Sequence, residues 1–267
     1  MCGVKRVWLC IVDGVRGVTQ LHGVVYVISP SSSTIKRFLA TTRQQLADIN
    51  VKGLREPCDI AACQRTSQLY VADNRHCVWR VSADGEDIQL WLPKSPSGNL
   101  KLWTLSVTAM RLLVTSHDTK QLIQFDAGGD ELQHIRLPRY MNPCHAVESP
   151  TATFIVSHLN SRQKRNRNQY QVSEVNTEGR VLRQFSHSSL GYTPHIVADS
   201  QGNIFLADET SCRILLLDAQ LALRHVIIDE HQLNNKSPWR LCYMEHSGQL
   251  LVAFDGSSIA VFDVLQR

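Results

Sequence analysis

Short runs of β-branched and other apolar residues recur along the chain, and polar turn residues follow each run. The most regular runs are VYVIS from Val25, LYVAD from Leu69, LLVTS from Leu112, FIVSH from Phe154, IFLAD from Ile204 and LLVAF from Leu250. Aligning their central positions gives spacings of 44, 43, 42, 50 and 46 residues. A period near 45 with several strands per unit is typical of β-propellers, because each blade is a small sheet that cannot bury both faces by itself.

Each repeat unit contains strand patterns separated by turns, most clearly in the second and fifth units. The turns contain Asp84-Gly85, Gly128-Gly129, Glu178-Gly179 and Gln201-Gly202. Glycine adopts a positive φ at little cost, so these dipeptides suit hairpin reversals. We therefore predict a single all-β domain over residues 1–267, a six-bladed β-propeller of four-stranded blades. The predicted blades cover roughly residues 14–52, 53–97, 98–139, 140–188, 189–233 and 234–267.

The last unit has only three strand patterns, and a spare one lies at the start of the chain. Residues 5–12, KRVWLCIV, form this extra apolar run before the first unit begins. Pairing it with the last unit would complete that blade and remove two open sheet edges, which otherwise promote aggregation. We therefore expect the N-terminal strand to close the ring.

The composition limits the class of protein but does not indicate a function. The chain is 43% hydrophobic and 19% charged, with a net charge of +4, too mild by itself to indicate a nucleic-acid partner. No segment approaches the roughly 20 consecutive apolar residues of a membrane helix. The eight cysteines are dispersed without a C-x-x-C pair. That pattern favours reduced thiols, and we expect a cytoplasmic monomer that has no cofactor and does not contact a membrane.

The repeats share further residues beyond their apolar runs. Unit five carries Pro194, Asp199, Gly202, Ala207, Asp208 and Arg213, and unit two carries Pro57, Ala72, Asp73, Asn74 and Arg75. In this arrangement the chain resembles NHL repeats, although the other four units match only partly. The resemblance implies a propeller like those of tripartite-motif ubiquitin ligases and RNA-binding regulators, while related six-bladed folds house lyases and lactonases. The sequence contains no RING, B-box or coiled coil, so we expect no ligase activity in this chain.

Loops before the first strand and between the second and third strands of each blade share one rim of such a propeller, and that rim usually binds. The predicted partner-binding residues there are Arg75, His76, Arg162, Lys164, Arg165, Arg167, Tyr192, Arg213, Trp239 and Arg240. Arginine and aromatic side chains together suit an acidic peptide or phosphate groups. The alternative is a solvated set of loops in which Arg75 and Arg213 brace neighbouring blades.

The segment SRQKRNRNQ explains the long spacing of 50 residues and adds four positive charges, at Arg162, Lys164, Arg165 and Arg167. A charged insertion that a blade does not require should project as a loop, where functional residues concentrate. It is a contact for an acidic partner or RNA, a mobile loop without a partner, or a basic targeting patch. No aromatic residue lies inside the run, which gives base stacking little support.

Residues after the first-strand prolines fall in one register and approach the axial channel. They are Cys58, Cys144, His195 and Trp239, with His145 adjacent. A Cys/His cluster there could hold a metal, but packed thiols and histidines are the more common arrangement. The chain has no G-x-S-x-G, G-x-x-x-x-G-K-[ST] or H-E-x-x-H motif. We therefore expect a non-enzymatic scaffold that binds a protein or acidic peptide segment, with RNA binding or a metal-dependent channel enzyme as alternatives.

Overall fold

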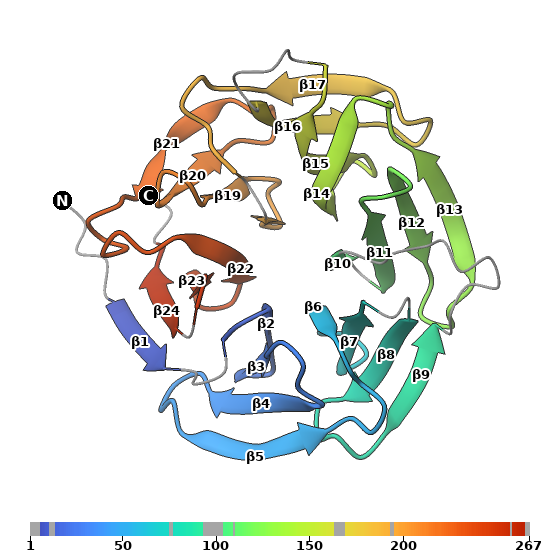
Figure 1. The fold of residues 1–267 in the computed structure, drawn as a ribbon, viewed down its shortest axis with the longest axis vertical. Coiled ribbons are helices and arrows are strands. Elements are labelled where there is room, and N and C mark those ends of the chain that lie inside the picture. The colour runs from blue at the N-terminus through green and yellow to red at the C-terminus, as the bar shows by residue number, and fades with distance from the viewer. Residues whose placement is uncertain are drawn as a thin grey trace.

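A computed structural model describes residues 6–10, 14–74, 77–92, 104–108, 110–162, 169–192, 195–256 and 258–264, with the side chains of 6–10 and 169 left out. Its strands form six four-stranded antiparallel sheets arranged as the blades of a propeller (Figure 1). The predicted all-β, six-bladed fold is confirmed. No helix long and apolar enough to cross a membrane occurs in the part of the chain that the structure describes.

The first three blades follow one another along the chain, each ordered from the central axis outward. Blade one contains β2 (Gly17–Leu21), β3 (Val24–Ile28), β4 (Thr34–Leu39) and β5 (Gln45–Asn50). Blade two contains β6 (Pro57–Cys63), β7 (Gln68–Asp73), β8 (Cys77–Ser82) and β9 (Ile88–Leu92). Blade three contains β10 (Thr104–Thr108), β11 (Arg111–Ser116), β12 (Gln121–Phe125) and β13 (Glu131–Arg136).

The remaining blades repeat the same order until the last one. Blade four contains β14 (Met141–Glu148), β15 (Phe154–Asn160), β16 (Gln169–Val175) and β17 (Val181–Phe185). Blade five contains β18 (Ile196–Ala198), β19 (Ile204–Asp208), β20 (Arg213–Leu217) and β21 (Leu223–Ile228). Blade six contains β22 (Pro238–Met244), β23 (Gln249–Phe254), β24 (Ser258–Asp263) and β1 (Arg6–Cys10).

The N-terminal strand closes the ring, as the sequence predicts. β1 pairs antiparallel with β24, from Arg6 opposite Phe262 to Cys10 opposite Ser258. Figure 1 shows β1 as the outermost strand of blade six, beside blade one. The first and last segments of the chain are therefore joined by backbone hydrogen bonds within one sheet.

The apolar core is distributed around the ring because each blade buries its faces against its two neighbours. Six clusters of buried residues lie at the six interfaces between adjacent blades. Second strands such as β7 and β19 are almost wholly buried, whereas fourth strands such as β5 and β21 are largely exposed. The apolar runs that carry the sequence period are these second strands, which explains why the period is visible there.

The two faces of the ring carry different connections. We define the upper face as the one that carries two kinds of connection. These are the connections that lead into each first strand and those that join each second strand to the third. The lower face carries the connections from first to second and from third to fourth strands. β15 ends at Asn160 on the upper face, so Ser161 and Arg162, which follow it, belong to this face.

Deleting residues 1–12 tests the importance of ring closure. The truncation removes β1 and leaves β24 as an open edge, so we expect the melting temperature to fall by roughly 10 °C or more, at about 2–4 °C per kcal/mol. Differential scanning calorimetry of the full chain and the truncated chain measures this. A deletion of residues 1–4, which keeps β1, is the control. Equal melting temperatures for the two truncations would contradict this view of closure.

Candidate functional site

A β-bulge opens the innermost strand in three of the six blades. The register shifts between Pro57 and Asp59, between Pro143 and His145, and between Pro238 and Arg240. A bulge leaves one residue out of the ladder and changes the direction of the residues that follow it. The omitted residues are Cys58, Cys144 and Trp239.

The bulges bring equivalent residues to one level of the channel. Asp59, His145 and Arg240 pair with Ala72, Ser157 and Ala253 of the second strands. His195 occupies the same place in blade five, because its carbonyl accepts the amide of Ala207. Blade one places Gly17 there, opposite Ile28, and blade three places Thr104, opposite Thr115. We call this set the channel ring: Gly17, Asp59, Thr104, His145, His195 and Arg240.

The register predicted from sequence for the channel residues is therefore wrong in three blades. The sequence predicts Cys58, Cys144 and Trp239 at the same level of the channel as His195. In the structure, the residue after each of these three lies at that level instead. The recurring leading proline marks where the strand begins, but it does not reveal the extra residue after it. Burial raises the thiol pKa of both Cys58 and Cys144 to about 12, so both thiols are protonated at neutral pH.

Side chains of the channel ring connect neighbouring blades through backbone groups. The Asp59 carboxylate accepts the amides of Leu105, at 2.8 Å, and Ile60, at 3.0 Å. The Thr104 hydroxyl donates to the carbonyl of Cys144 at 3.1 Å. These bonds join blade two to blade three and blade three to blade four, and they satisfy polar groups that lie away from water.

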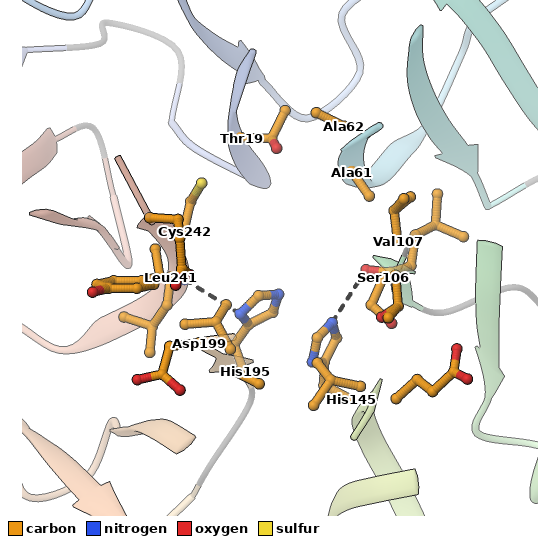
Figure 2. Close-up of a pocket in the computed structure, with 18 of the residues that line it drawn as sticks. Thr19, Ala61, Ala62, Ser106, Val107, His145, His195, Asp199, Leu241 and Cys242 are labelled. Atoms are coloured by element: carbon orange, nitrogen blue, oxygen red, sulfur yellow. Dashed lines mark hydrogen bonds between the residues drawn. The ribbon is translucent and has the colours of Figure 1, made fainter. Parts of the chain in front are cut away.

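The two histidines lie next to each other in the channel. Their rings stack with centroids 3.9 Å apart, and both are buried. His145 Nε2 lies 3.2 Å from the carbonyl of Leu105, to which it donates, and His195 Nδ1 accepts the amide of Leu241 at 3.3 Å (Figure 2). Burial lowers the pKa of His145 to about 3 and that of His195 well below its usual range. Both imidazoles are therefore neutral at neutral pH.

Arg240 compensates the charge of Asp59 across the channel. Its Nε lies 3.6 Å from Asp59 Oδ1, and its Nη2 donates to the Cys58 carbonyl at 3.5 Å. Arg240 belongs to blade six and Asp59 to blade two, so the pair passes blade one, where Gly17 has no side chain. Burial raises the pKa of Asp59 to about 6, and the guanidinium opposes this shift. Arg240 was predicted on the rim, but it lies inside the channel with only 5% of its surface exposed.

Asp59, His145 and His195 are the group among the described residues whose ligand atoms, all within 4.8 Å of one another, could hold a metal ion. Two imidazoles and a carboxylate form a common metal-binding set. Three contacts oppose that use here. Arg240 already supplies a cation to Asp59, the imidazoles are stacked, and the amide at His195 Nδ1 places the ring proton on Nε2. The residues fit internal charge pairing better than a metal, and we assign none.

The channel ring divides the channel into two cavities. The lower pocket is about 570 Å³, and His145 and His195 are among the residues that line it (Figure 2). The upper pocket is about 360 Å³, and its lining comprises Arg16, Pro30, Ser31, Glu56, Pro57, Cys58, Asn74, Trp239 and Arg240. Arg240 thus lines the upper pocket, while both histidines line the lower one.

Aromatic side chains form a strip on the upper face beside the upper pocket. The rings of Tyr170 and Tyr192 meet edge to face, with their centroids 5.1 Å apart. The centroids of the Tyr192 and Trp239 rings are 5.9 Å apart. The guanidinium of Arg240 lies 4.8 Å from the centre of the Trp239 ring. We call Tyr170, Tyr192 and Trp239 the aromatic strip. The structure thus brings together Tyr192, Trp239 and Arg240, which the sequence predicts as partner-binding residues.

The other predicted rim residues have different outcomes. Arg213 pairs with Asp208 at 2.8 Å and donates to Ser189, so its guanidinium is held within blade five and the connection that enters it. Arg162 is exposed, and its guanidinium lies 4.1 Å from the centre of the Tyr140 ring. The predictions for Arg75, His76, Lys164, Arg165 and Arg167 lie outside the described residues.

Comparison with known proteins establishes the fold but no family. No family model matches the chain, and no curated protein matches it. Virginiamycin B lyase from Staphylococcus aureus is similar in structure, with a TM-score of 0.67, 10% identity, and 98% of this chain and 100% of that one covered. The WD40 β-propeller domain of Doa1 is also similar, with a TM-score of 0.67 and 14% identity. The match covers 98% of this chain and 97% of that one. A chain of the nidogen/laminin complex has a TM-score of 0.61 and 13% identity. That match covers 82% of this chain and 81% of the other. The NHL resemblance therefore remains a property of the sequence pattern.

These similarities also correct the expectation that the chain is not an enzyme. That expectation came from the fold and from missing motifs, and it is wrong, because the similar structures include a lyase as well as hydrazine synthase from Kuenenia stuttgartiensis. At 10% and 14% identity these matches transfer no activity to this chain. They do show that a similar fold occurs in enzymes, so the fold gives no reason to expect that catalysis is absent.

Replacing Arg240 tests the charge pairing in the channel. Arg240→Met leaves Asp59 buried without its cation, and we expect a loss of about 3–5 kcal/mol in the free energy of unfolding. The double variant Asp59→Asn/Arg240→Met should regain most of that loss. Urea unfolding measures both variants. A double variant no more stable than Arg240→Met would show that the ion pair is not the relevant interaction.

The lowered pKa of His145 predicts a pH dependence. Between pH 6.5 and about 3 the unfolded chain binds a proton at this residue and the folded chain does not, so its stabilising contribution falls as pH falls. The stability advantage of the wild type over His145→Gln should therefore shrink by about 2 kcal/mol from pH 7.5 to pH 5. Urea unfolding at both pH values measures it, and a constant difference would contradict the neutral buried imidazole.

Proposed function

We propose that this protein binds an extended, acidic segment of a partner protein on its upper face, across the aromatic strip and the upper pocket. The observation that carries this proposal is the position of Trp239. Its ring belongs to the aromatic strip through Tyr192 and also lines the upper pocket. Strip and pocket are thus continuous, which suits a segment that lies along the rim and places one side chain into the channel mouth.

The composition of this surface resembles the centre of a protein interface. Tryptophan, tyrosine and arginine dominate the binding energy of interfaces, mostly from well-packed positions near their centre. Tyr170, Tyr192 and Trp239 are each half-buried, and they contact one another. Their rings are therefore ordered before binding, which lowers the entropy lost when a partner docks.

The charges around the upper pocket favour an acidic segment. Arg16 and Arg240 line it, with Glu56 as the only carboxylate among the described lining residues. Glu56 accepts a hydrogen bond from Asn74, and Arg240 is paired with Asp59. Arg16 is exposed at the opening and can meet a carboxylate of the partner. Arg162 adds a further exposed cation on the same face.

The test starts from peptides selected for binding to the purified full chain, with affinities measured by fluorescence polarisation. Trp239→Ala should weaken binding by about 30-fold, the effect of removing a residue worth about 2 kcal/mol. The matched control is Tyr243→Ala, since Tyr243 is a half-buried aromatic at the lower end of the same strand, β22. Its affinity should equal that of the wild type.

Three results would contradict the proposal. The first is equal affinity for Trp239→Ala and wild type, and the second is equal loss in both variants. The third is a preference for basic over acidic peptides. Competition by single-stranded RNA with a steep dependence on salt would instead indicate nucleic-acid binding on this face.

A further inference from the structure

The lower pocket has the size and the wall of a site for a small apolar molecule. Its volume of about 570 Å³ lies inside the range of about 300–1,000 Å³ that ligand pockets occupy. Each of the six innermost strands contributes an apolar side chain to the lining, and these residues are Val18, Ala61, Val107, Val147, Val197 and Leu241. Such a wall favours the hydrocarbon part of a ligand, because contact with it removes apolar surface from water.

His195 places one hydrogen-bond donor in this cavity. Its Nδ1 accepts the Leu241 amide at 3.3 Å, so the ring proton lies on Nε2. Figure 2 shows the ring pointing into the channel, with Nε2 directed away from Leu241. Among the described residues, none accepts a hydrogen bond from Nε2. Only 6% of the His195 surface is exposed, so a ligand oxygen that accepts from this poorly hydrated donor is favoured.

The His195 donor is fixed before a ligand binds. The Leu241 amide holds one side of the ring, and the His145 ring stacks on it with centroids 3.9 Å apart. A donor that is already ordered loses little entropy on binding. His145 adds no acceptor, because its Nε2 donates to Leu105 and its Nδ1 is fully buried. The two histidines therefore suit a carbonyl group, which only accepts, better than a hydroxyl group, which also donates.

Two of the carboxylates that line the pocket are bonded to the protein itself. Both carboxylate oxygens of Asp199 accept hydrogen bonds, from the amides of Gln201 and Asn203 and from the Asn203 side chain. Glu245 accepts the amide and the hydroxyl of Ser200. Neither group therefore requires a cation from a ligand.

The third carboxylate of the lining is paired in the same way. Glu148 lies 2.6 Å from Arg111 and accepts from Gln124 at 2.8 Å. The negative charges of the lining still disfavour an anion, and no lysine or arginine lines the pocket among the described residues. The pocket thus favours a neutral ligand over a cation or an anion.

We propose that the lower pocket binds a neutral, largely apolar small molecule with a carbonyl group, whose oxygen accepts a hydrogen bond from Nε2 of His195. The six apolar side chains surround the hydrocarbon part of this molecule. The site does not depend on the peptide site of the upper face, because the channel ring separates the two pockets.

Probes with one carbon skeleton test the chemical class. Adamantanone, adamantylamine and adamantanecarboxylate are compared by isothermal titration calorimetry with the full chain. We expect the ketone to bind at least about tenfold more tightly than either charged analogue, because each analogue would bury a charge without a partner.

A variant and a probe of equal shape test the hydrogen bond. Methyleneadamantane has the shape of the ketone but no acceptor oxygen. His195→Phe should weaken adamantanone binding about fivefold, the effect of one hydrogen bond, and leave methyleneadamantane binding unchanged. His158→Phe is the matched control, since His158 is a buried histidine that bonds Ser173 and does not line the pocket. It should bind both probes as the wild type does.

Two further measurements apply even where His195→Phe does not fold. In the infrared spectrum of wild type, the carbonyl band of bound adamantanone should lie below its position in hexane, because a hydrogen bond weakens the C=O bond. Val107→Trp fills the pocket from β10, so it should abolish ketone binding and leave peptide binding on the upper face unchanged.

Four results would overturn the proposal. The first is the lack of saturable binding for adamantanone, camphor and cyclohexanone up to about 10 mM. The second is equal affinity for the ketone and a charged analogue, and the third is an equal effect of His195→Phe on the ketone and on methyleneadamantane. The fourth is a bound carbonyl band at its position in hexane. Peptide binding by a chain that binds no ketone would leave the proposed function of the upper face intact.

Discussion

The pairing of β1 with β24 is the interaction on which the rest of the structure depends. Each blade buries its faces only against its neighbours, so a ring of blades is stable only when every interface exists. The six apolar clusters at the six interfaces express this requirement. One of them joins blade one to blade six, where Val25 and Val27 pack with Leu251 and Ala253. Closing blade six therefore protects an interface as well as an edge.

Closure also fixes the channel, because residues distant in sequence reach one level only when the ring is complete. The bulges at Cys58, Cys144 and Trp239 bring Asp59, His145 and Arg240 to that level. The resulting bonds run between blades, as from Thr104 to Cys144 and from Asp59 to Leu105. The polar groups of the channel thus act together with the apolar interfaces, and both connect neighbouring blades.

The fold could be predicted from sequence because its signal is local and repeated. Second strands such as Leu69–Asp73 and Ile204–Asp208 are buried on both faces, so apolar residues mark them in every blade. Asp199 accepts the amide of Asn203 within its own turn, whereas Asp73 and Asp208 accept the amides of Arg55 and Gly191, 18 and 17 residues away. The aromatic residues Tyr192 and Trp239 could be named because their loops belong to one rim.

The channel chemistry could not be predicted, because it depends on single-residue offsets and on pairs far apart in sequence. A bulge shifts the register by one residue, and nothing in P-C-D or P-W-R distinguishes it from a regular strand. The pairing of Arg240 with Asp59 depends on closure of the ring. Glu245 follows a strand like many other glutamates, and only the structure shows that its carboxylate accepts the amide and hydroxyl of Ser200 in blade five.

Gly17 shows how an absent side chain shapes the channel. A Cβ atom there would lie 2.9 Å from the Ile60 side chain and 3.0 Å from its backbone nitrogen, so blades one and two could not pack as closely. Past this position, the Arg240 side chain of blade six pairs with Asp59 of blade two. That ion pair keeps the guanidinium on the upper side of the channel ring, away from the carboxylates of the lower pocket. Arg240 therefore lines the upper pocket alone, while Glu148, Asp199 and Glu245 line the lower one.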